Sequence, residues 1–162
     1  MADETRERIV QSAGPIFASC GYEAATVRQI CDAAQVNHAA INYYFGGKQS
    51  LYLEAVRLAH QTRLAEYPPP EWPPETPARE KLRMFVRAML SRMLEPSESS
   101  WPVRLLMREM IEPTGACQSI VEDFIRPQLR QLLNILREIL PGPLPDYRYM
   151  QLAFSIIGQS LH

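Results

Sequence analysis

The stretch from Thr26 to Leu51 holds the side chains of this sequence whose types and spacing best suit contact with DNA. Arginine and lysine bind phosphates or a guanine edge, asparagine pairs with adenine, and alanine or tyrosine touches a thymine methyl group. The candidate residues are Thr26, Arg28, Asn37, His38, Ala39, Ala40, Asn42, Tyr43, Tyr44 and Lys48. Plainer roles stay open for them, such as a helix cap for Asn37, a solvated ring for His38 and a half-buried one for Tyr44.

Two short helices joined by a tight turn must position these residues. Thr26 is a good N-cap for the first helix. Its apolar residues recur at helical spacing at Val27, Ile30, Cys31 and Ala34. Gln35-Val36-Asn37 breaks that pattern, and Asn37 can cap a second helix over residues 38–45 that leaves its polar residues facing out. This is the pattern of a helix-turn-helix, whose second helix enters the major groove.

The elements on either side of this unit are also predicted to be helical. The first helix covers about residues 4–20, with a kink at Pro15 and an end at Gly21. After Gly46 and Gly47, another helix runs from about Gln49 to residue 66.

Residues 67–77 read YPPPEWPPETP, and no helix survives this density of proline. The simpler interpretation is an ordered or semi-rigid connection between two domains. The sharper alternative is a ligand for a partner with an SH3-like groove.

The C-terminal half has the apolar periodicity of helices over residues 76–95, 101–111, 119–140 and from about 147 onward. Pro127 is expected to kink or split the third of these. Because no stretch alternates like a strand, the predicted fold is all-α. The last helix stops at His162 in the middle of its apolar stripe, so we expect the natural chain to continue.

Composition sets further bounds. The net charge is −1, and residues 1–60 carry five basic against six acidic side chains, so a nucleic-acid partner depends on local clustering. Cys20, Cys31 and Cys117 lack metal-ligand spacing and are predicted to be small buried hydrophobes, with a metal or redox site as the alternative. We find no catalytic motif, no cofactor motif, no signal peptide and no membrane span, and we predict a cytoplasmic protein that is not an enzyme.

Three motifs carry a resemblance to a known family. They are T-V-R-x-I at residues 26–30, A-x-V-N at 34–37 and A-I-N-Y-Y-F-G-G-K-x-x-L at 40–51. The chain resembles the TetR/AcrR family of bacterial transcriptional regulators over about residues 5–58. Within that family, the sequence AAINYYFGGK at residues 39–48 is similar to the CecR-type branch. Two residues depart from the family pattern. Gln35 stands where glycine is usual, so it is expected to take a positive φ, and Asn42 stands where tyrosine is usual.

The resemblance implies a homodimeric repressor with a DNA-binding domain at residues 1–48 and an effector-binding and dimerisation domain at residues 49–162. Two sets of residues follow as expectations. The effector set is Phe85, Met89, Met93, Trp101, Leu105, Arg108, Glu109 and Phe124, for which the simpler alternative is core packing or, for Arg108 and Glu109, a surface ion pair. The dimer set is Leu129, Leu132, Leu136, Phe154, Ile157, Gly158 and Leu161, whose stripes can instead be buried within one chain.

Two other functions stay open at this point. One is a small-molecule-binding protein or enzyme on a helical scaffold without DNA binding. The other is a protein-interaction module that works through the proline segment.

Overall fold

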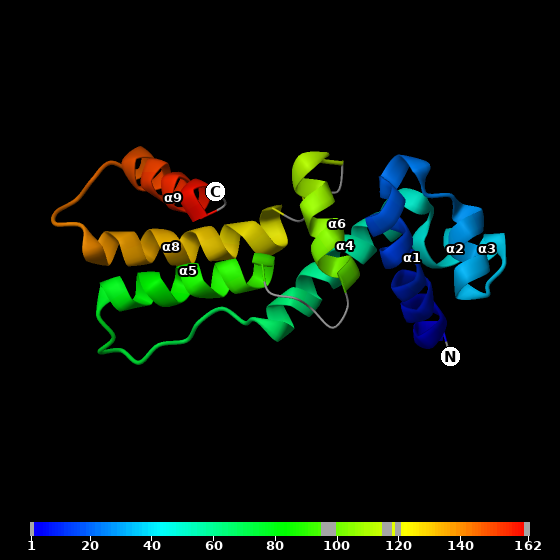
Figure 1. Cartoon of the computed structure of the whole chain (residues 1–162), viewed down its shortest axis with the longest axis horizontal. Helices are drawn as coiled ribbons and strands as arrows, with labels where there is room; N and C mark the ends of the chain where they lie inside the picture. Colours follow the sequence, from blue (N-terminus) through cyan, green and yellow to red (C-terminus); the bar gives the residue numbers. More distant parts are fainter. Residues whose placement is uncertain (1, 95–99, 115–117, 119–120, 161–162) are drawn as a thin grey trace. The chain divides into compact units, whose positions relative to one another are not determined.

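The computed structural model describes residues 2–94, 100–114, 118 and 121–160 (Figure 1). In this part of the chain every regular element is a helix, which confirms the predicted all-α fold. The elements are α1 (Ala2–Ala24), α2 (Val27–Ala34), α3 (His38–Phe45), α4 (Lys48–Glu66), α5 (Ala78–Leu94), α6 (Ser100–Ile111), the π-helix η1 (Val121–Ile125), α8 (Arg126–Ile139) and α9 (Asp146–Ser160). None of the described helices is both long and apolar enough to span a lipid bilayer.

The helices divide between two compact units. The first unit comprises residues 1–65 and 96–120, and the second comprises residues 66–95 and 121–162. The first unit therefore holds α1 to α4 together with α6, although α6 lies far along the sequence. The predicted functional boundary at residue 48 stays a prediction.

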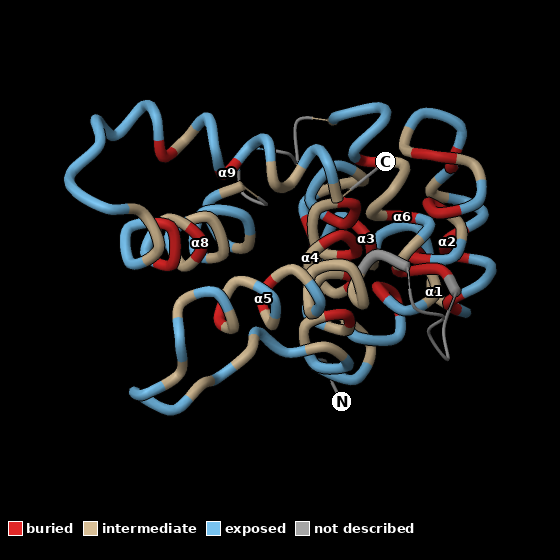
Figure 2. Tube along the Cα trace, turned by 60° about the vertical axis from the view of Figure 1, so that its left-hand side comes forward, coloured by how far each residue is buried: buried red, intermediate tan, exposed pale blue. Residues whose placement is uncertain are grey.

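The core of the first unit is formed by buried residues of α1 to α4 and of α6, and the buried stretches of these helices are red in Figure 2. Its largest fully buried apolar side chains are Ile9, Phe17, Ile30, Ile41, Leu51, Tyr52, Val56 and Leu105. The rings of Phe17 and Tyr52 meet edge to face with centroids 4.9 Å apart, a favoured aromatic geometry. Helix α6 packs on α1 through Trp101, whose ring lies so close to Gly14 that a Cβ there would be 2.6 Å from it. Any larger residue at position 14 would therefore force the Trp101 ring or one of the two helices to shift.

The predicted kink at Pro15 is wrong. Helix α1 continues through Pro15 to Ala24, and its only non-helical dihedrals are at Gly21, with φ 81° and ψ 175°. Pro15 removes the N–H that would reach the Gln11 carbonyl, but both residues are exposed, so water can satisfy that oxygen. The helix therefore tolerates this proline. The helical dihedrals are interrupted at Gly21, where the end of the first helix was expected, because glycine most easily adopts a positive φ.

The second unit is built from α5, α8 and α9. Its buried core consists of Phe85, Leu132, Ile135, Leu136, Tyr149 and Ala153. At Pro127 the helix type changes: the π-helix η1 ends at Ile125 and α8 starts at Arg126 with Pro127 in its first turn. Ile125 keeps helical dihedrals, so the helical backbone is not split there, and the expected kink stays a prediction.

The proline segment contains no helix, as predicted, and it is anchored within the second unit. Trp72 packs against the core. Arg92 Nη1 donates a hydrogen bond to the Tyr67 carbonyl at 3.1 Å, and Gln131 Nε2 donates one to the Pro70 carbonyl at 3.4 Å. These contacts fix residues 67–77 in the second unit, although the segment has no regular secondary structure.

Candidate nucleic-acid interface

The start of α2 is fixed by a reciprocal cap. The Gln29 backbone N–H donates to Thr26 Oγ1 at 3.2 Å, and the Thr26 backbone N–H donates to Gln29 Oε1 at 2.9 Å. This is a capping box, which satisfies two of the unpaired donors at a helix start. The predicted role of Thr26 as an N-cap is confirmed.

The turn between α2 and α3 has the strained residue that the sequence predicts. Gln35 adopts a left-handed conformation with φ 53° and ψ 48°, and the Val36 N–H returns to the Cys31 carbonyl at 3.0 Å. Asn37 then caps α3, because its Oδ1 accepts the Ala40 N–H at 3.0 Å. Both ends of the turn are thus defined by hydrogen bonds, so the direction of α3 is well determined.

One face of α3 is exposed and the other is buried. Ile41 and Phe45 are buried in the first unit, while Tyr43 is 81% exposed. The residues on the outer face are His38, Ala39, Asn42 and Tyr43, together with the cap Asn37, as predicted. Ala40 and Tyr44 are partly buried.

A cleft of about 560 Å³ runs beside this outer face. Its lining residues are Thr5 of α1, Gln35, Val36 and Asn37 of the turn, and Ala39, Ala40, Tyr43 and Tyr44 of α3. The rings of Tyr43 and Tyr44 pack edge to face, 4.9 Å apart. The recognition candidates of α3 therefore adjoin a hollow whose opposite side is formed by α1.

The two basic side chains that are predicted to contact DNA, Arg28 and Lys48, differ in how firmly the protein holds them. The Arg28 side chain is 89% exposed, and its Nε lies 3.9 Å from Asp32 Oδ2, a weak surface ion pair. Lys48 is held more firmly: its Nζ donates to the Glu23 carbonyl at 3.2 Å and lies 4.5 Å from the Tyr22 ring centroid. An ammonium group has three N–H donors, so this arrangement leaves capacity for a phosphate.

The contact between Lys48 and the end of α1 joins residues that are far apart in the sequence. Tyr22 and Glu23 lie 26 and 25 positions before Lys48, and nothing in the local pattern predicts their approach.

Cys31 is a buried packing residue, as predicted for it. Cys31 is buried, and its thiol donates to the Asn37 carbonyl at 3.6 Å. Burial, followed by the nearby Asp32 charge, raises the pKa of the Cys31 thiol, so the group stays protonated at neutral pH. Cys20 is half-buried, and Cys117 lies outside the described residues. No group of three or more metal-binding side chains occurs in the described part of the chain.

The predicted effector residues belong to two different units. Trp101, Leu105, Arg108 and Glu109 lie on α6 in the first unit, and Phe85, Met89, Met93 and Phe124 lie in the second. Trp101, Leu105, Glu109 and Phe85 are buried, and Arg108, Met89 and Phe124 are half-buried. The side chain of Met93 lies outside the described residues.

Glu109 and Arg108 do not form the surface ion pair that was the alternative for them. Glu109 is 6% exposed and accepts hydrogen bonds from the Tyr52 hydroxyl at 2.6 Å and from Thr114. Arg108 instead pairs with Glu112 at 3.2 Å and donates to the Ser19 carbonyl at 3.5 Å.

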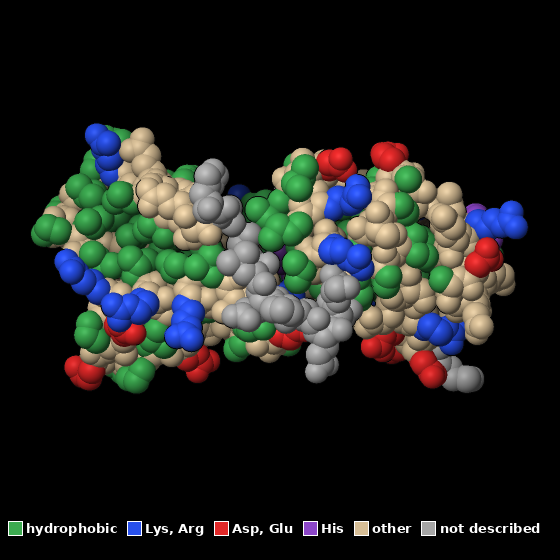
Figure 3. Space-filling model, in the orientation of Figure 1, with side chains coloured by type: hydrophobic (Ala, Val, Ile, Leu, Met, Phe, Trp, Pro, Cys, Tyr) green, Lys and Arg blue, Asp and Glu red, His purple; other side chains and the backbone are tan. Residues whose placement is uncertain are grey.

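The predicted dimer residues fall into buried and exposed groups. Leu132 and Leu136 belong to the core of the second unit, and Leu129 and Ile157 pack against that core. Phe154 is 59% exposed, Gly158 is exposed, and Leu161 lies outside the described residues. Figure 3 shows hydrophobic side chains gathered over α8 and α9 on the face in view.

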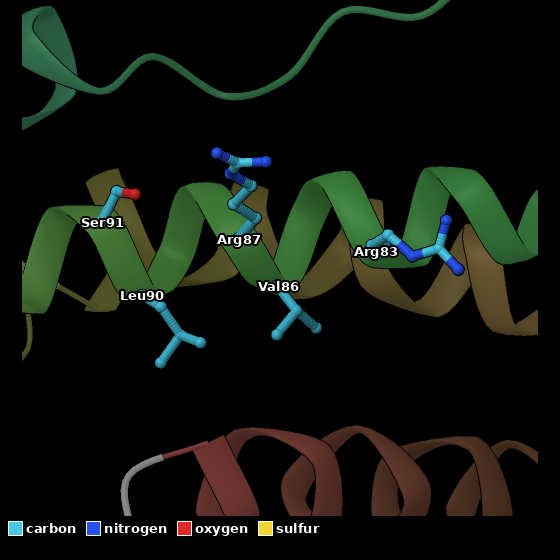
Figure 4. Close-up of a pocket in the computed structure, with 5 residues that line it drawn as sticks. All are labelled: Arg83, Val86, Arg87, Leu90 and Ser91. Atoms are coloured by element: carbon cyan, nitrogen blue, oxygen red, sulfur yellow. The ribbon is translucent and has the colours of Figure 1, made fainter.

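A shallow hollow on α5 was not expected. It measures about 390 Å³ and is lined by Arg83, Val86, Arg87, Leu90 and Ser91, a single helical stripe. Figure 4 shows Val86 and Leu90 projecting to one side of α5 and Arg87 and Ser91 to the other. Arg83 is paired with Glu80 one turn earlier.

A short helix, a left-handed turn and a capped second helix with an exposed polar face together define a helix-turn-helix DNA-binding protein. Comparison with known families agrees. Residues 9–55 match the model for bacterial regulatory proteins of the tetR family, and residues 78–162 match the C-terminal domain of the HTH-type transcriptional dual regulator CecR. The chain belongs to the TetR family, with a CecR-type C-terminal domain, and is a DNA-binding transcriptional regulator.

Individual relatives agree with this assignment. The chain is similar to the HTH-type transcriptional dual regulator CecR of Shigella flexneri, with 24% identity over 98% of this chain and 75% of the relative. It is 39% identical to the HTH-type transcriptional repressor AcnR of Corynebacterium glutamicum over 38% of this chain and 32% of the relative. A crystal structure of a transcriptional regulator from Aquifex aeolicus VF5 has the same fold, with a TM-score of 0.61 and 19% identity over 96% of this chain and 82% of that one.

Proposed function

We propose that this regulator represses transcription in the cytoplasm as a homodimer that reads a pseudo-palindromic operator with α3 of each subunit. The observation that carries the proposal is the exposed outer face of α3, which presents asparagine, histidine, alanine and tyrosine at a helix start fixed by the Asn37 cap. Asn42 is assigned to a base edge, and Tyr43 to a thymine methyl group or a phosphate. Members of a dimeric helix-turn-helix class present two such helices about 34–36 Å apart.

Two basic residues are assigned to the DNA backbone. Arg28 is exposed on α2 and reaches a phosphate or a guanine edge once it leaves Asp32. Lys48 keeps its bond to the Glu23 carbonyl and donates a second N–H to a phosphate. Thr26 and Tyr44 lie at helix ends, where hydroxyls typically bind the backbone.

Dimerisation is assigned to the outer face of α8 and α9. Phe154 exposes a large apolar ring that contact with a second subunit would bury, and a Cβ added at Gly158 would meet no atom within 4 Å, so a partner helix can approach there. An α8–α9 pair from each subunit makes a four-helix bundle.

A small apolar or amphipathic effector is assigned to the C-terminal half of the chain. Its binding alters DNA affinity by linkage, with a coupling of typically about 1–3 kcal/mol. The residues predicted for this role are those of the effector set, of which Phe85, Trp101, Leu105 and Glu109 are buried.

An electrophoretic mobility shift on the DNA flanking the regulator's own gene tests the proposal. We expect a retarded complex whose apparent affinity falls with salt by about 0.9 log units per log unit of salt for each phosphate bound. Arg28→Ala removes one contact per subunit, so the slope of a dimer should fall by about 2. Arg87→Ala, which removes the same charge from α5, is the matched control and should leave the slope unchanged. No retardation at low salt would overturn the proposal.

A further inference from the structure

Two arginines in the first turns of α1 contact the ends of both helices of the helix-turn-helix. Arg6 and Arg8 are two of the five basic residues among residues 1–60, where acidic residues number six. Because basic residues are few in this region, each of them is a candidate for binding a DNA phosphate. Their side chains are instead directed to groups of the protein itself.

Arg8 holds the C-terminal end of α2. Its Nε donates a hydrogen bond of 3.1 Å to the carbonyl of Ala34, the last residue of that helix. The final carbonyls of a helix have no partner within it and carry the negative end of the helix dipole, so a guanidinium there is stabilising. The next residue is Gln35, whose left-handed conformation sets the direction of the turn. Arg8 therefore fixes the point from which α3 departs.

Arg6 holds the C-terminal end of α3. Its guanidinium carbon lies 5.2 Å from the ring centroid of Phe45, the last residue of α3, within the range of a cation–π contact. Its Nη2 also donates to Glu54 Oε2 of α4 at 2.8 Å, and Arg57 donates to the other oxygen of that carboxylate at 3.0 Å. Arg6 thus ties the end of α3 to both α1 and α4.

We propose that Arg6 and Arg8 are positioning residues for sequence-specific DNA binding, which act through the Ala34 carbonyl and the Phe45 ring. This inference rests on the proposed function of α3. Thr5, next to Arg6, forms the α1 side of the cleft along α3, so the placement of α1 also sets how wide that cleft is. The two arginines determine the angle at which α3 meets the bases.

A positioning role and a phosphate contact differ in what they do to binding. Base contacts need α3 at a defined angle, whereas non-specific binding depends on net phosphate neutralisation. Loss of positioning therefore lowers affinity for the operator and spares affinity for unrelated DNA. Loss of a phosphate contact lowers both and reduces the salt slope.

The test uses the full chain and two DNA fragments of equal length. One is the fragment that the wild-type protein enriches most strongly from a randomised library, and the other is a scrambled version of it. For Arg8→Met and Arg6→Met we expect operator affinity to fall about tenfold. This is the change that corresponds to one charge-assisted hydrogen bond, if the energy of the lost contact must be supplied when α3 binds the bases. Affinity for scrambled DNA should change by less than about twofold, and the salt slope should stay within about 0.5 of the wild-type value.

Arg28→Met is the matched control, since it removes an exposed guanidinium that is assigned to the DNA. It should weaken binding to both fragments and lower the slope. Arg8→Lys should restore part of the preference for the operator, because an ammonium can still donate to the Ala34 carbonyl. Titration with excess DNA gives the active fraction of each variant, so a loss caused by unfolding is corrected for.

The inference is overturned if Arg6→Met and Arg8→Met weaken both fragments equally. Equal weakening with a reduced slope would assign the arginines to phosphates. A low active fraction with both corrected affinities equal to those of the wild type would also overturn the inference, because it would assign the arginines to stability alone. A wild-type chain that enriches no sequence from the library is a different outcome, because it rejects the proposed function before any variant is compared.

Discussion

The buried contact between Tyr52 and Glu109 is expected to be a main stabilising interaction of the first unit. The Tyr52 hydroxyl donates to Glu109 Oε2 at 2.6 Å, and the two residues lie 57 positions apart in the chain. Tyr52 is 1% exposed and Glu109 is 6% exposed. The backbone N–H and the hydroxyl of Thr114 also donate to this carboxylate, at 2.9 and 3.0 Å to Oε1. This contact joins α4 to α6.

Tyr52→Phe removes the hydroxyl and leaves the ring in place. A hydrogen bond to a charged group contributes about 1.5–3 kcal/mol, and Glu109 keeps its two bonds from Thr114, so we expect a loss of about 2 kcal/mol. Because Glu109→Gln disturbs the same contact, the two substitutions should not be additive. A double-mutant cycle should give a coupling energy of about 1–2 kcal/mol.

Urea unfolding followed by circular dichroism measures this effect. For a slope of about 2 kcal/mol per molar urea, the Tyr52→Phe midpoint should fall by about 1 M. Tyr149→Phe is the matched control in the second unit. Within the described residues its hydroxyl accepts one long bond of 3.4 Å, from the Leu144 N–H, so the Tyr149→Phe midpoint should move by less than about 0.25 M.

The pH dependence of stability gives a second readout of the same contact. Burial, and then the hydrogen bond to Glu109, raise the pKa of Tyr52 above its ordinary value of 10.0. The native state therefore keeps this proton after the unfolded chain has lost it, so the stabilisation is complete below pH 10.0 and declines above it. Tyr52→Phe should flatten that decline. A Tyr52→Phe midpoint equal to that of the wild type, or strict additivity with Glu109→Gln, would refute the reasoning.

Three further changes have expected outcomes on stability. Gly14→Ala places a Cβ 2.6 Å from the Trp101 ring and should lower the thermal midpoint through a loss of about 1–3 kcal/mol; an equal or higher midpoint would contradict the contact. Gln35→Gly should raise stability by about 1 kcal/mol, since glycine adopts the left-handed conformation of φ 53° without strain, and a lower thermal midpoint would argue against this. Burial lowers the pKa of His60 to about 4 from 6.5, so stability should fall as the pH falls through this window, because the unfolded chain binds the proton first. Urea midpoints at neutral and acidic pH should show this loss in the wild type and less of it in His60→Gln.

The sequence predicts the parts of this fold that local chemistry decides. Thr26 and Asn37 are recognisable caps, and Gln35 is recognisable as a residue forced to a positive φ. Each of these depends on residues within a few positions, so short-range steric and hydrogen-bonding preferences are sufficient. The exposed face of α3 follows from the same periodicity.

The contacts between distant segments were not predictable in this way. Helix α6 packs against α1 in the same compact unit, which places Trp101 over Gly14 and Glu109 beside Tyr52. The apolar stripe of α6 shows that it has a buried side and does not show which helix covers it. The kink predicted at Pro15 is wrong for a related reason. The effect of this proline depends on whether the Gln11 carbonyl that it leaves unpaired faces water, and the local sequence does not show this.

The arginines of α1 illustrate the same limit for the candidate site. Counting charges along residues 1–60 gives no distinction between Arg6, Arg8 and Arg28. The structure separates them, because Arg6 and Arg8 contact protein groups at helix ends and Arg28 has only a weak ion pair at the surface. The contacts of each guanidinium therefore give the proposed difference in role, which the position of the residue in the sequence does not.

Selection of bound DNA from a randomised library by the full chain, followed by sequencing, tests the role of α3 most directly. We expect an inverted repeat whose half-site centres lie about one helical turn apart, roughly 34–36 Å. We also expect Tyr43→Ala and Asn42→Ala to change base preference within each half-site, since both residues lie on the exposed face of α3. A pool without enrichment, or an enriched sequence that neither substitution alters, would contradict the assignment of α3 as the recognition helix.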